Sequence, residues 1–216
     1  MATEYARQGA NVVITGRNAQ RAASVASKLD KDVPGTVTAL ALDLTRPSEI
    51  AEALSTIGRV DRLAIIGAVR DRNSLTDYDV TTATQLAVTK IVGYTAVVSA
   101  LAPRMTQDAS ILLFGGMAKE YPYPGSTTVT VVNAAVTGLI RTMSVELSPV
   151  RVNGIHPGPI EDSPFWRENT PMLVAFRKVS LTQRLGSMSD IVNGCVFLLE
   201  NPLANGIDLR LDGGHP

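Results

Sequence analysis

The sequence predicts an α/β fold in which helices cover both faces of a doubly wound parallel β-sheet, giving three layers. Short runs rich in β-branched residues alternate along the chain with longer stretches of helical periodicity. Parallel neighbours in a sheet need crossover connections of about a dozen or more residues, and helices usually supply them. The expected strands are 11–15, 36–42, 62–66, 110–114, 150–155 and 207–211, and the expected helices are 19–29, 47–57, 78–101, 128–147 and 189–199.

Turn and cap residues support these boundaries. Gly16 and Gly67 fall at the ends of strands, where a residue without Cβ is useful. Pro47 fits the first turn of a helix, because its missing N–H has no partner there in any case. Ser189 is the expected N-cap of the last helix.

The start of the chain departs from this scheme. Residues 1–9 look like the second half of a helix that runs directly into the strand 11–15. In a doubly wound sheet such a helix follows a first strand and a glycine-rich turn, and that strand lies in the middle of the sheet. The first strand is therefore missing from the chain. We expect that upstream residues are absent, the alternative being that something else fills the gap.

Composition favours one domain spanning 1–216. A chain of 216 residues, 45% of them hydrophobic, can bury a substantial core, and it contains no linker, repeat or change of composition. Twenty basic residues balance 20 acidic ones, which removes the electrostatic argument for nucleic acid or an anionic membrane as a partner. We therefore expect no nucleic-acid partner and no membrane partner.

Few residues are available for disulfides or metals. Cys195 is the single cysteine, and the two histidines are His156 and His215, so we expect no disulfide and no metal site. The N-terminus lacks a basic-then-apolar signal pattern, and no apolar run reaches the roughly 18 residues that cross a bilayer. These features predict a cytoplasmic protein.

Six segments together resemble the short-chain dehydrogenase/reductase family of the classical type. They occur in the family's order and at about its spacing, across nearly the whole chain. The resemblance implies a Rossmann-like fold, a nicotinamide dinucleotide cofactor and oxidation or reduction of a small substrate. The segments are GANVVITGRN (9–18), ALDLT (41–45), SALAPRM (99–105), PYPGSTTVTVVNAAVTGLIRTMSVEL (122–147), RVNGIHPGPIED (151–162) and LRLDGGHP (209–216).

The resemblance implies an adenosine end of a cofactor site. Arg17 corresponds to the arginine that binds the 2′-phosphate of NADP, with a solvated turn arginine as the alternative. Asp43 and Leu44 correspond to the pair that contacts adenine, although Asp43 suits a helix cap equally well. The glycine-rich turn that meets the pyrophosphate is not found in the sequence. NADP is the implied cofactor, and the alternative is none.

The nicotinamide end is implied by two further segments. Pro157, Gly158 and Ile160 correspond to the turn that lies against the nicotinamide amide, and a purely conformational role for this turn is the alternative. Gly67 and Ala68 stand where the family has the last two residues of Asn-Asn-Ala-Gly, so the polar side chains of that motif are replaced.

The family's catalytic residues are replaced as well. Its mechanism uses a tyrosine as acid or base, a lysine four residues later that lowers the phenol pKa, and a serine thirteen residues before the tyrosine. In this sequence the tyrosine position is Val129, the lysine position is Asn133 and the serine position is Gly116. The asparagine that completes the relay falls on Lys90. The sequence therefore offers no catalytic residue by the family mechanism.

Lys90 is the candidate substitute, because its ammonium could enter the space of the absent lysine. The alternative is a lysine whose stem follows apolar surface while its head lies in water. Tyr121 and Tyr123 lie in a loop that can approach the pocket, and Lys119 before them is expected to be exposed. His156 is interpreted as a structural histidine rather than a ligand contact.

Two function classes follow from these replacements. The first is a catalytically impaired relative, a pseudoenzyme used for assembly, ligand sensing or nucleotide binding. The second is an NADP-dependent oxidoreductase that acts on a carbonyl or alcohol through a non-standard active site. Apolar patterns at 165–166 and 171–173 predict a lid over a small apolar ligand. The helices 78–101 and 128–147 are apolar over more than one face, which predicts a homodimer or homotetramer through them.

Overall fold

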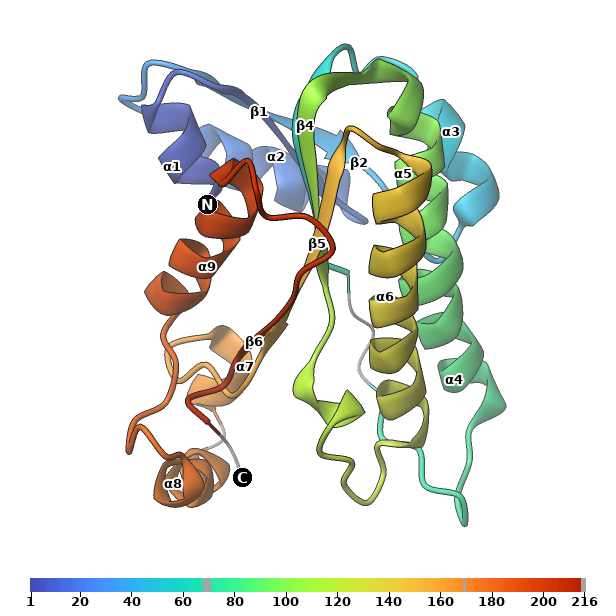
Figure 1. Cartoon of the computed structure of the whole chain (residues 1–216), viewed down its shortest axis with the longest axis vertical. Coiled ribbons are helices and arrows are strands. Elements are labelled where there is room, and N and C mark those ends of the chain that lie inside the picture. Colours follow the sequence, from blue (N-terminus) through green and yellow to red (C-terminus); the bar gives the residue numbers. More distant parts are fainter. Residues whose placement is uncertain (68–70, 169, 215–216) are drawn as a thin grey trace.

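The computed structural model describes residues 1–67, 71–168 and 170–214 as a layered α/β fold (Figure 1). Every pairing between its named strands is parallel, which confirms the fold class that the alternating pattern predicts. The strands are β1 (Asn11–Gly16), β2 (Thr36–Ala41), β3 (Val60–Ile65), β4 (Met105–Phe114), β5 (Arg151–Pro157) and β6 (Asp208–Leu211). The helices are α1 (Ala2–Arg7), α2 (Ala19–Leu29), α3 (Ile50–Ala53), α4 (Val80–Ala87), α5 (Tyr94–Leu101), α6 (Thr127–Glu146), α7 (Pro164–Arg167), α8 (Thr170–Val179) and α9 (Met188–Glu200).

The strands form two sheets rather than the single sheet that the sequence predicts. One sheet pairs β1 with β2, from Asn11 opposite Thr36 to Gly16 opposite Ala41. The other has the order β3-β4-β5-β6. Within the described ranges no strand pairing joins β1 to β3, which agrees with the expected gap in the middle of the sheet.

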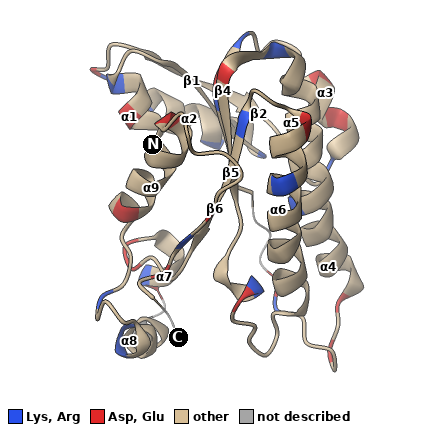
Figure 2. Ribbon diagram, viewed as in Figure 1, with Lys and Arg blue, Asp and Glu red and all other residues tan. Residues whose placement is uncertain are grey.

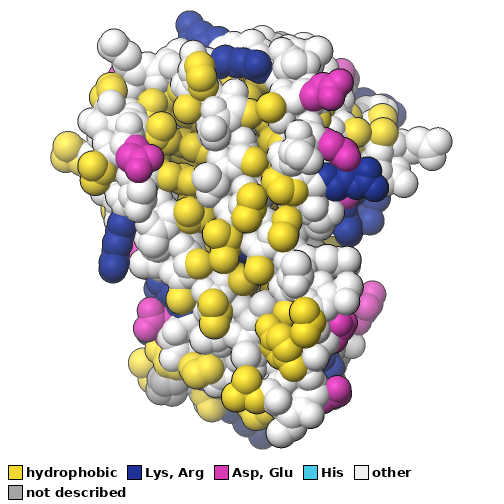
Figure 3. Space-filling model, turned by 90° about the vertical axis from the view of Figure 1, so that its right-hand side faces the viewer, with side chains coloured by type: hydrophobic (Ala, Val, Ile, Leu, Met, Phe, Trp, Pro, Cys, Tyr) yellow, Lys and Arg dark blue, Asp and Glu magenta, His cyan; other side chains and the backbone are white. Residues whose placement is uncertain are grey.

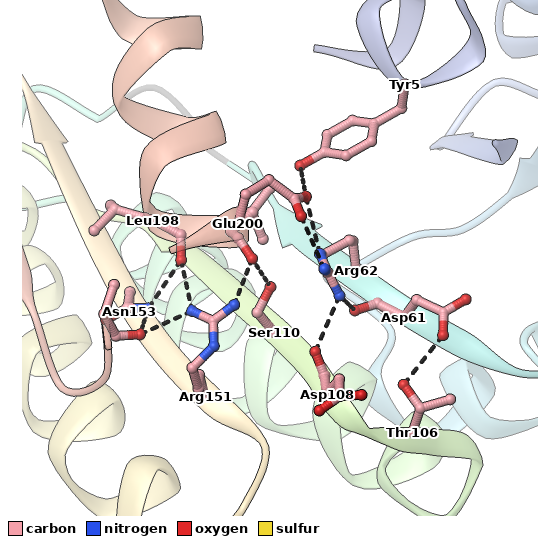
Figure 4. Close-up of polar contacts among 12 residues, drawn as sticks. Tyr5, Asp61, Arg62, Thr106, Asp108, Ser110, Arg151, Asn153, Leu198 and Glu200 are labelled. Carbon is pink, nitrogen blue, oxygen red and sulfur yellow. Dashed lines mark hydrogen bonds and ion pairs between the residues drawn. The ribbon is translucent and has the colours of Figure 1, made fainter. Parts of the chain in front are cut away.

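Side chains connect the two sheets at both ends. Tyr5 of α1 donates its hydroxyl proton to Glu200 at 2.6 Å, and Arg62 of β3 donates to the same carboxylate at 2.9 and 2.8 Å (Figure 4). Beyond the carboxyl end of β3, Leu44 packs closely on Gly67, where an added Cβ would lie 2.4 Å from Leu44 Cδ1. α1 and the loop after β2 thus tie the smaller sheet to the larger one.

The four-stranded sheet carries a core on each of its faces. Ile111 and Leu113 of β4 belong to the cluster that contains Val136 and Ile140 of α6. Leu112, between them, belongs to the opposite cluster, which includes buried residues of α9. This division follows from the two-residue period of a strand, because successive side chains point to opposite faces. A third, smaller cluster of Ala6, Ala26 and Val37 lies between α1, α2, β1 and β2.

The expected helix 78–101 is interrupted in its middle. Residues Val88–Gly93 form a π-helical segment between α4 and α5. A π-helical turn widens the helix by one residue and often marks a functional site. Gly93 at its end lies against the loop after β2, since an added Cβ would be 2.5 Å from the Leu44 carbonyl oxygen. The segment places Lys90 next to Phe114 at the carboxyl end of β4.

The helical run 80–104 and α6 are long and apolar enough, by length and composition alone, to cross a membrane. This differs from the expectation that no apolar run has that length. Both contribute buried side chains to the core beneath the four-stranded sheet, and core helices of this kind meet the same criteria.

Two helix boundaries differ from the expected ones. The N-cap of α9 is Ser187 rather than Ser189, because Ser187 Oγ accepts from the Asp190 amide at 3.1 Å while Asp190 accepts from the Ser187 amide at 2.8 Å. This is a capping box, which satisfies two unpaired N–H groups together. The expected helix 47–57 consists of a 3₁₀ turn at Pro47–Glu49 followed by the short α3.

Polar side chains of the sheet hold the carboxyl end of α9 (Figure 4). Arg151 donates to the carbonyl oxygens of Leu198, Leu199 and Ala204 at 2.5 to 3.0 Å. The buried Asn153 donates to Leu198 and Ala204 at 3.2 and 2.7 Å, and Ser110 donates to Leu199 at 2.7 Å. Carbonyl groups at a helix end lack partners within the helix. Each of these three acceptors therefore has two side-chain donors.

Candidate cofactor and substrate site

A cavity of about 350 Å³ lies at the carboxyl end of β2. Arg17 follows β1 and Asp43 follows β2, so parallel strands bring these residues to the same edge of the smaller sheet. Both line the cavity, as the resemblance implies for the adenosine end. The cavity is lined by Arg17, Ala41, Leu42, Asp43, Arg46, Glu49, Ile50 and Ala53.

Asp43 remains ionised at this site. Its Oδ1 accepts from the Thr45 amide at 2.9 Å and from the Thr45 hydroxyl at 2.8 Å. Partial burial acts to raise the pKa of Asp43, but the bonds from Thr45 and the charges of Arg17 and Arg46 outweigh it and lower the pKa. Through these bonds to Thr45, Asp43 also stabilises the turn that follows β2, which is close to the capping role that the sequence offers as the alternative. Sequence reasoning missed Arg46, since an exposed loop arginine carries no signal of its own.

The end of β3 is occupied by the chain itself. The amide of Gly67 donates to the Tyr94 hydroxyl at 3.0 Å, and that hydroxyl lies 3.0 Å from the Gly67 carbonyl oxygen. Leu44, expected to contact adenine, packs against this point. Ala68 lies outside the described residues. Both the amide and the carbonyl oxygen of Gly67 are therefore hydrogen-bonded to the Tyr94 hydroxyl.

The turn after β5 is held against β6. Pro157 ends the strand, and the Gly158 amide donates to the Leu211 carbonyl oxygen at 2.9 Å. A Cβ on Gly158 would lie 2.8 Å from Asp212 Cα, so only glycine fits this close approach. Ile160 is buried in the core on the α9 side. These contacts give the turn a structural role whatever it binds.

The structure brings together two of the three positions to which the resemblance assigns catalysis. A Cβ on Gly116 would lie 2.9 Å from Asn133 Nδ2, so the asparagine amide occupies the space beside Gly116. Val129 lies one helical turn before Asn133 on α6 and is partly buried. Glycine, valine and asparagine side chains carry no group that exchanges a proton near neutral pH.

Lys90 is buried rather than reaching water, so the expected surface-stem alternative is wrong. Its Nζ donates to the Phe114 carbonyl oxygen at 2.5 Å and to the Tyr94 hydroxyl at 3.2 Å. Burial lowers the pKa of Lys90 to about 8. Burial also raises the pKa of Tyr94 above its usual range. The amine therefore lies at the carboxyl end of β4, because its acceptor Phe114 is the last residue of that strand and precedes Gly116 by two residues.

His156 is fully buried, with both ring nitrogens bonded, which makes it a structural residue in this fold. Its Nδ1 accepts from the Gly116 amide at 3.1 Å, and its Nε2 bonds Asp208. Lys119 pairs with the same carboxylate and has only 10% of its side chain exposed, so its expected exposure is wrong. Burial acts to raise the pKa of Asp208, but bonds from His156 and Lys119 lower it overall. Sequence reasoning missed Asp208, although an aspartate within the apolar run IDLRL is a usable signal.

Aromatic side chains pack α7 against α8. The Trp166 ring packs edge-on against Phe165 and Phe176, at centroid distances of 5.0 and 5.6 Å. Arg177 of α8 pairs with Glu161 at 2.6 Å. These contacts lie in the two short helices for which the apolar pattern predicts a lid; the lid itself stays a prediction. In the neighbouring loop, Tyr121 lies under Arg210 at 4.8 Å and Tyr123 is exposed.

Comparisons with known proteins agree with this architecture. A protein-family model described as enoyl-(acyl carrier protein) reductase matches residues 1–215. The human protein "Dehydrogenase/reductase SDR family member 2, mitochondrial" is 28% identical over 228 residues, covering 99% of this chain and 80% of that protein.

Solved structures give the same result. A structure named "short chain dehydrogenase/reductase family protein" has a TM-score of 0.85 and 28% identity, covering 99% of this chain and 89% of that one. A 7α-hydroxysteroid dehydrogenase complexed with NADH and 7-oxo glycochenodeoxycholic acid has a TM-score of 0.89 and 25% identity, covering 99% of this chain and 88% of that one. The chain belongs to the short-chain dehydrogenase/reductase family.

Proposed function

We propose that this protein is a catalytically impaired member of its family, which acts by binding a ligand and by assembling with copies of itself. The contact between Gly116 and Asn133 carries the proposal. It places the serine and lysine positions side by side, with neither a hydroxyl nor an ammonium between them. Val129, at the tyrosine position, supplies no proton.

The three replacements remove functions that depend on one another. Reduction of a carbonyl needs a proton for the developing alkoxide, and an acid of matched pKa delivers it. The family's lysine tunes that acid and its serine orients the carbonyl, so the groups act as a unit. A serine at position 116 would also meet Asn133 at 2.9 Å, so restoring that hydroxyl alone requires Asn133 to move. Residual activity by the family mechanism is therefore not expected.

NADP is the cofactor that the retained residues suit. When bound, NADP supplies a hydride donor or acceptor. Arg17 offers a planar fork for the 2′-phosphate, and Asp43 offers an acceptor beside it. These residues fit the adenosine end. At the other end the Gly67 amide is bonded to Tyr94 and the Gly158 amide to Leu211, so these two donors are not free for a ligand.

Assembly is supported by the outer face of the helical layer. Charged residues are sparse along α4, α5 and α6 (Figure 2), and apolar side chains run down the face that carries them (Figure 3). In the helices of this layer, Val92 is 48% exposed, and Val131 and Val145 of α6 are 61% and 76% exposed. A helix that is apolar on both sides needs a second partner besides its own sheet. A homodimer or homotetramer closed by symmetry covers this face.

Two measurements test the proposal. Purified protein is incubated with NADPH and a panel of aldehydes and ketones. We expect no NADPH oxidation above the rate without protein. Turnover that disappears in Lys90→Met refutes catalytic impairment. Sedimentation at micromolar concentration measures assembly, and a monomer refutes that part. Val131→Asp on the exposed face is expected to dissociate the assembly. Ser27→Asp, at an exposed position of α2 outside this helical layer, is the control for an added charge and is expected to leave the assembly intact.

An oxidoreductase with a non-standard site is the second candidate, and one observation favours it. The buried Lys90 amine, with its pKa lowered to about 8, lies at the end of β4 close to Gly116. A general acid at this place would make kcat/KM fall as the pH rises through about 8. A fall in kcat/KM through about pH 8 that persists unchanged in Lys90→Met would exclude this role.

A further inference from the structure

The two sheets leave an open position in the middle of the fold, between β1 and β3 (Figure 1). β1 pairs with β2 and β3 pairs with β4, and within the described ranges no pairing joins β1 to β3. We propose that this position, called the strand slot below, is a docking site for an extended peptide segment of another molecule, which adds as a parallel strand between β1 and β3. The proposal holds whether or not the protein turns over a substrate.

β1 and β3 run in the same direction on either side of the slot. At their carboxyl ends the loop after β2 meets the end of β3, because a Cβ on Gly67 would lie 2.4 Å from Leu44 Cδ1. At their amino ends a cavity of about 450 Å³ is lined by Tyr5 of α1, the helix before β1, and by Asp61 and Arg62 of β3 (Figure 4). An added strand is therefore parallel to both neighbours, and a length of 6 residues matches each of them.

Each flanking strand has one edge without a partner strand. Outside the ladders with β2 and β4, no backbone hydrogen bond of residues 11–15 or 62–65 is found within the described ranges. The N–H and C=O groups of a strand alternate between its two edges, so part of this backbone faces the slot unpaired. A strand in the slot bonds to both edges at once, and main-chain hydrogen bonds are the source of affinity when a peptide extends a sheet.

The exposure of side chains beside the slot agrees with a missing neighbour. Leu112 and Leu113 of β4, which has a partner strand on each side, are 0% exposed. In β3, Leu63 and Ala64 are only partly buried, and Val13 of β1 is 43% exposed. Side chains on adjacent strands cover one another on each face of a sheet. A strand in the slot is therefore expected to bury more of these three residues.

The surroundings of the slot favour a peptide that is apolar on both faces. Leu63 packs against the core beneath α5 and α6, whereas Ala64 and Tyr5 pack against the core on the α9 side. Parallel strands that are covered on both faces are nearly continuous apolar runs. The flanking segments VVIT (12–15) and LAI (63–65) contain neither a charge nor a proline, the residues that usually protect an exposed edge from pairing.

The amino-terminal mouth of the slot favours a basic residue at the start of the peptide. The cavity there is lined by two guanidinium groups, which are paired with Asp61 and Glu200. Asp108 is a third carboxylate of the same cavity, so one negative charge is left over. Its carbonyl oxygen accepts from Arg62 at 3.0 Å, but among the described residues its exposed carboxylate has no hydrogen-bond or ion-pair partner. A lysine before the apolar run supplies the matching charge.

Binding of synthetic peptides to the full chain tests the slot. The basic peptide is acetyl-Lys-Val-Val-Ile-Val-Val-Gly-Ser-Lys-Lys, whose polar tail keeps it in solution. The proline peptide carries proline at the third and fifth positions, which removes two backbone donors. By calorimetry we expect the basic peptide to bind with a Kd of about 10–100 μM and the proline peptide to bind at least about tenfold more weakly. Equal binding of the two peptides, or no binding of the basic peptide at about 1 mM, overturns the proposal.

Hydrogen exchange locates the bound peptide. The basic peptide is expected to slow the exchange of amides in both β1 and β3 by about tenfold or more, because it bonds to both edges. β2 is the internal control, since its outer edge also has no partner strand within the described ranges. Slowing confined to β2 would mean that the peptide adds to an ordinary sheet edge, and would overturn the proposal.

Exchange before peptide is added tests the other occupants. Amides of β1 and β3 that are already as slow as those of β4 show a filled slot. A second copy fills it if the protection disappears on dilution, and the chain's own residues fill it if the protection persists. Either result overturns a slot for another molecule's peptide, while fast exchange at β1 and β3 supports it.

Exchanging the charge at the mouth tests the direction of the peptide. The acidic peptide has glutamate in place of the first lysine. Asp108→Lys is expected to weaken binding of the basic peptide and to tighten binding of the acidic one, each by about threefold, because an exposed ion pair contributes little. A gain in affinity cannot come from misfolding. Asp77→Lys, at an exposed loop position outside this cavity, is the matched control and is expected to change neither affinity. Unchanged affinities in Asp108→Lys overturn the proposal.

Discussion

Replacing Arg151 by methionine tests how the carboxyl end of α9 is held. Methionine keeps the apolar stem and removes the guanidinium, which donates to three carbonyl oxygens. A hydrogen bond from a charged donor contributes about 1.5–3 kcal/mol, so three of them would suggest a large loss. Two features reduce it. Asn153 and Ser110 still donate to the same carbonyl oxygens, and burial lowers the pKa of Arg151, which shows that its charged form is held at a cost.

We therefore expect Arg151→Met to lower the free energy of unfolding by only about 2 kcal/mol. For a chain of this length that corresponds to a fall in Tm of about 4–8 °C. Urea denaturation and a thermal scan measure both quantities. A loss above about 4 kcal/mol would mean that the carbonyl oxygens have no second donor, contrary to the structure.

A double-mutant cycle tests whether Ser110 and Arg151 share the Leu199 carbonyl oxygen as an acceptor. Ser110→Ala alone leaves Arg151 on the Leu199 carbonyl oxygen, and Arg151→Met alone leaves Ser110 there. The double variant leaves that buried acceptor without a side-chain donor, so its cost is expected to exceed the sum of the single costs by about 1–2 kcal/mol. Ser144→Ala, on the exposed face of α6, is the control and is expected to be additive with Arg151→Met. Additivity of Ser110→Ala with Arg151→Met would refute the shared-acceptor argument.

Three further predictions concern stability. Gly115→Ala places a Cβ 2.2 Å from the His156 ring and is expected to lower Tm strongly. Gly58→Ala, before β3, has nothing within 4 Å of its new Cβ and is expected to stabilise by about 0.4–1 kcal/mol; equal Tm shifts would contradict both. The pKa of Asp208 is lowered in the folded protein, so the stability it contributes is present above about pH 4 and lost as the pH falls. Denaturation from pH 5 to pH 3 should therefore weaken the wild type more than Asp208→Asn, and parallel curves would refute the linkage. Burial lowers the pKa of Lys90 to about 8, so the unfolded chain binds the proton more tightly and stability rises between about pH 8 and pH 10. Lys90→Met is expected to abolish this rise, and its persistence would assign the rise to another group.

Sequence reasoning succeeded where local signals decide the structure. The expected helix 19–29 coincides with α2, because Asn18 caps it and accepts from the Arg21 amide at 2.8 Å. Arg17 and Asp43 line one cavity, as adjacent parallel strand ends require.

Sequence reasoning failed where the hydrogen-bond or packing partner of a residue comes from a distant segment. The π-helical turn at Val88–Gly93 has no composition signal, and the buried position of Lys90 depends on the end of β4. Lys119 looks like an exposed loop residue because its partner, Asp208, lies 89 residues away. Asn133 and Gly116 can be aligned from sequence, but their contact needs the packing of α6 against the loop after β4.

The division of the strands into two sheets has a consequence for unfolding. β1, β2 and α2 pack on a small apolar cluster with α1, and Leu40, Leu42 and Leu44 pack against the main core. No ladder of backbone hydrogen bonds within the described ranges couples β1 and β2 to β3. Cooperativity between parts of a protein comes from such shared contacts, and weakly coupled parts open at lower free energy than the whole. Amides of β1 and β2 should therefore exchange with solvent by a sub-global opening, while amides of β4 and β5 exchange only when the molecule unfolds. The chain would then lose its adenosine-end cavity, which depends on Arg17 and Asp43, well before it loses its core.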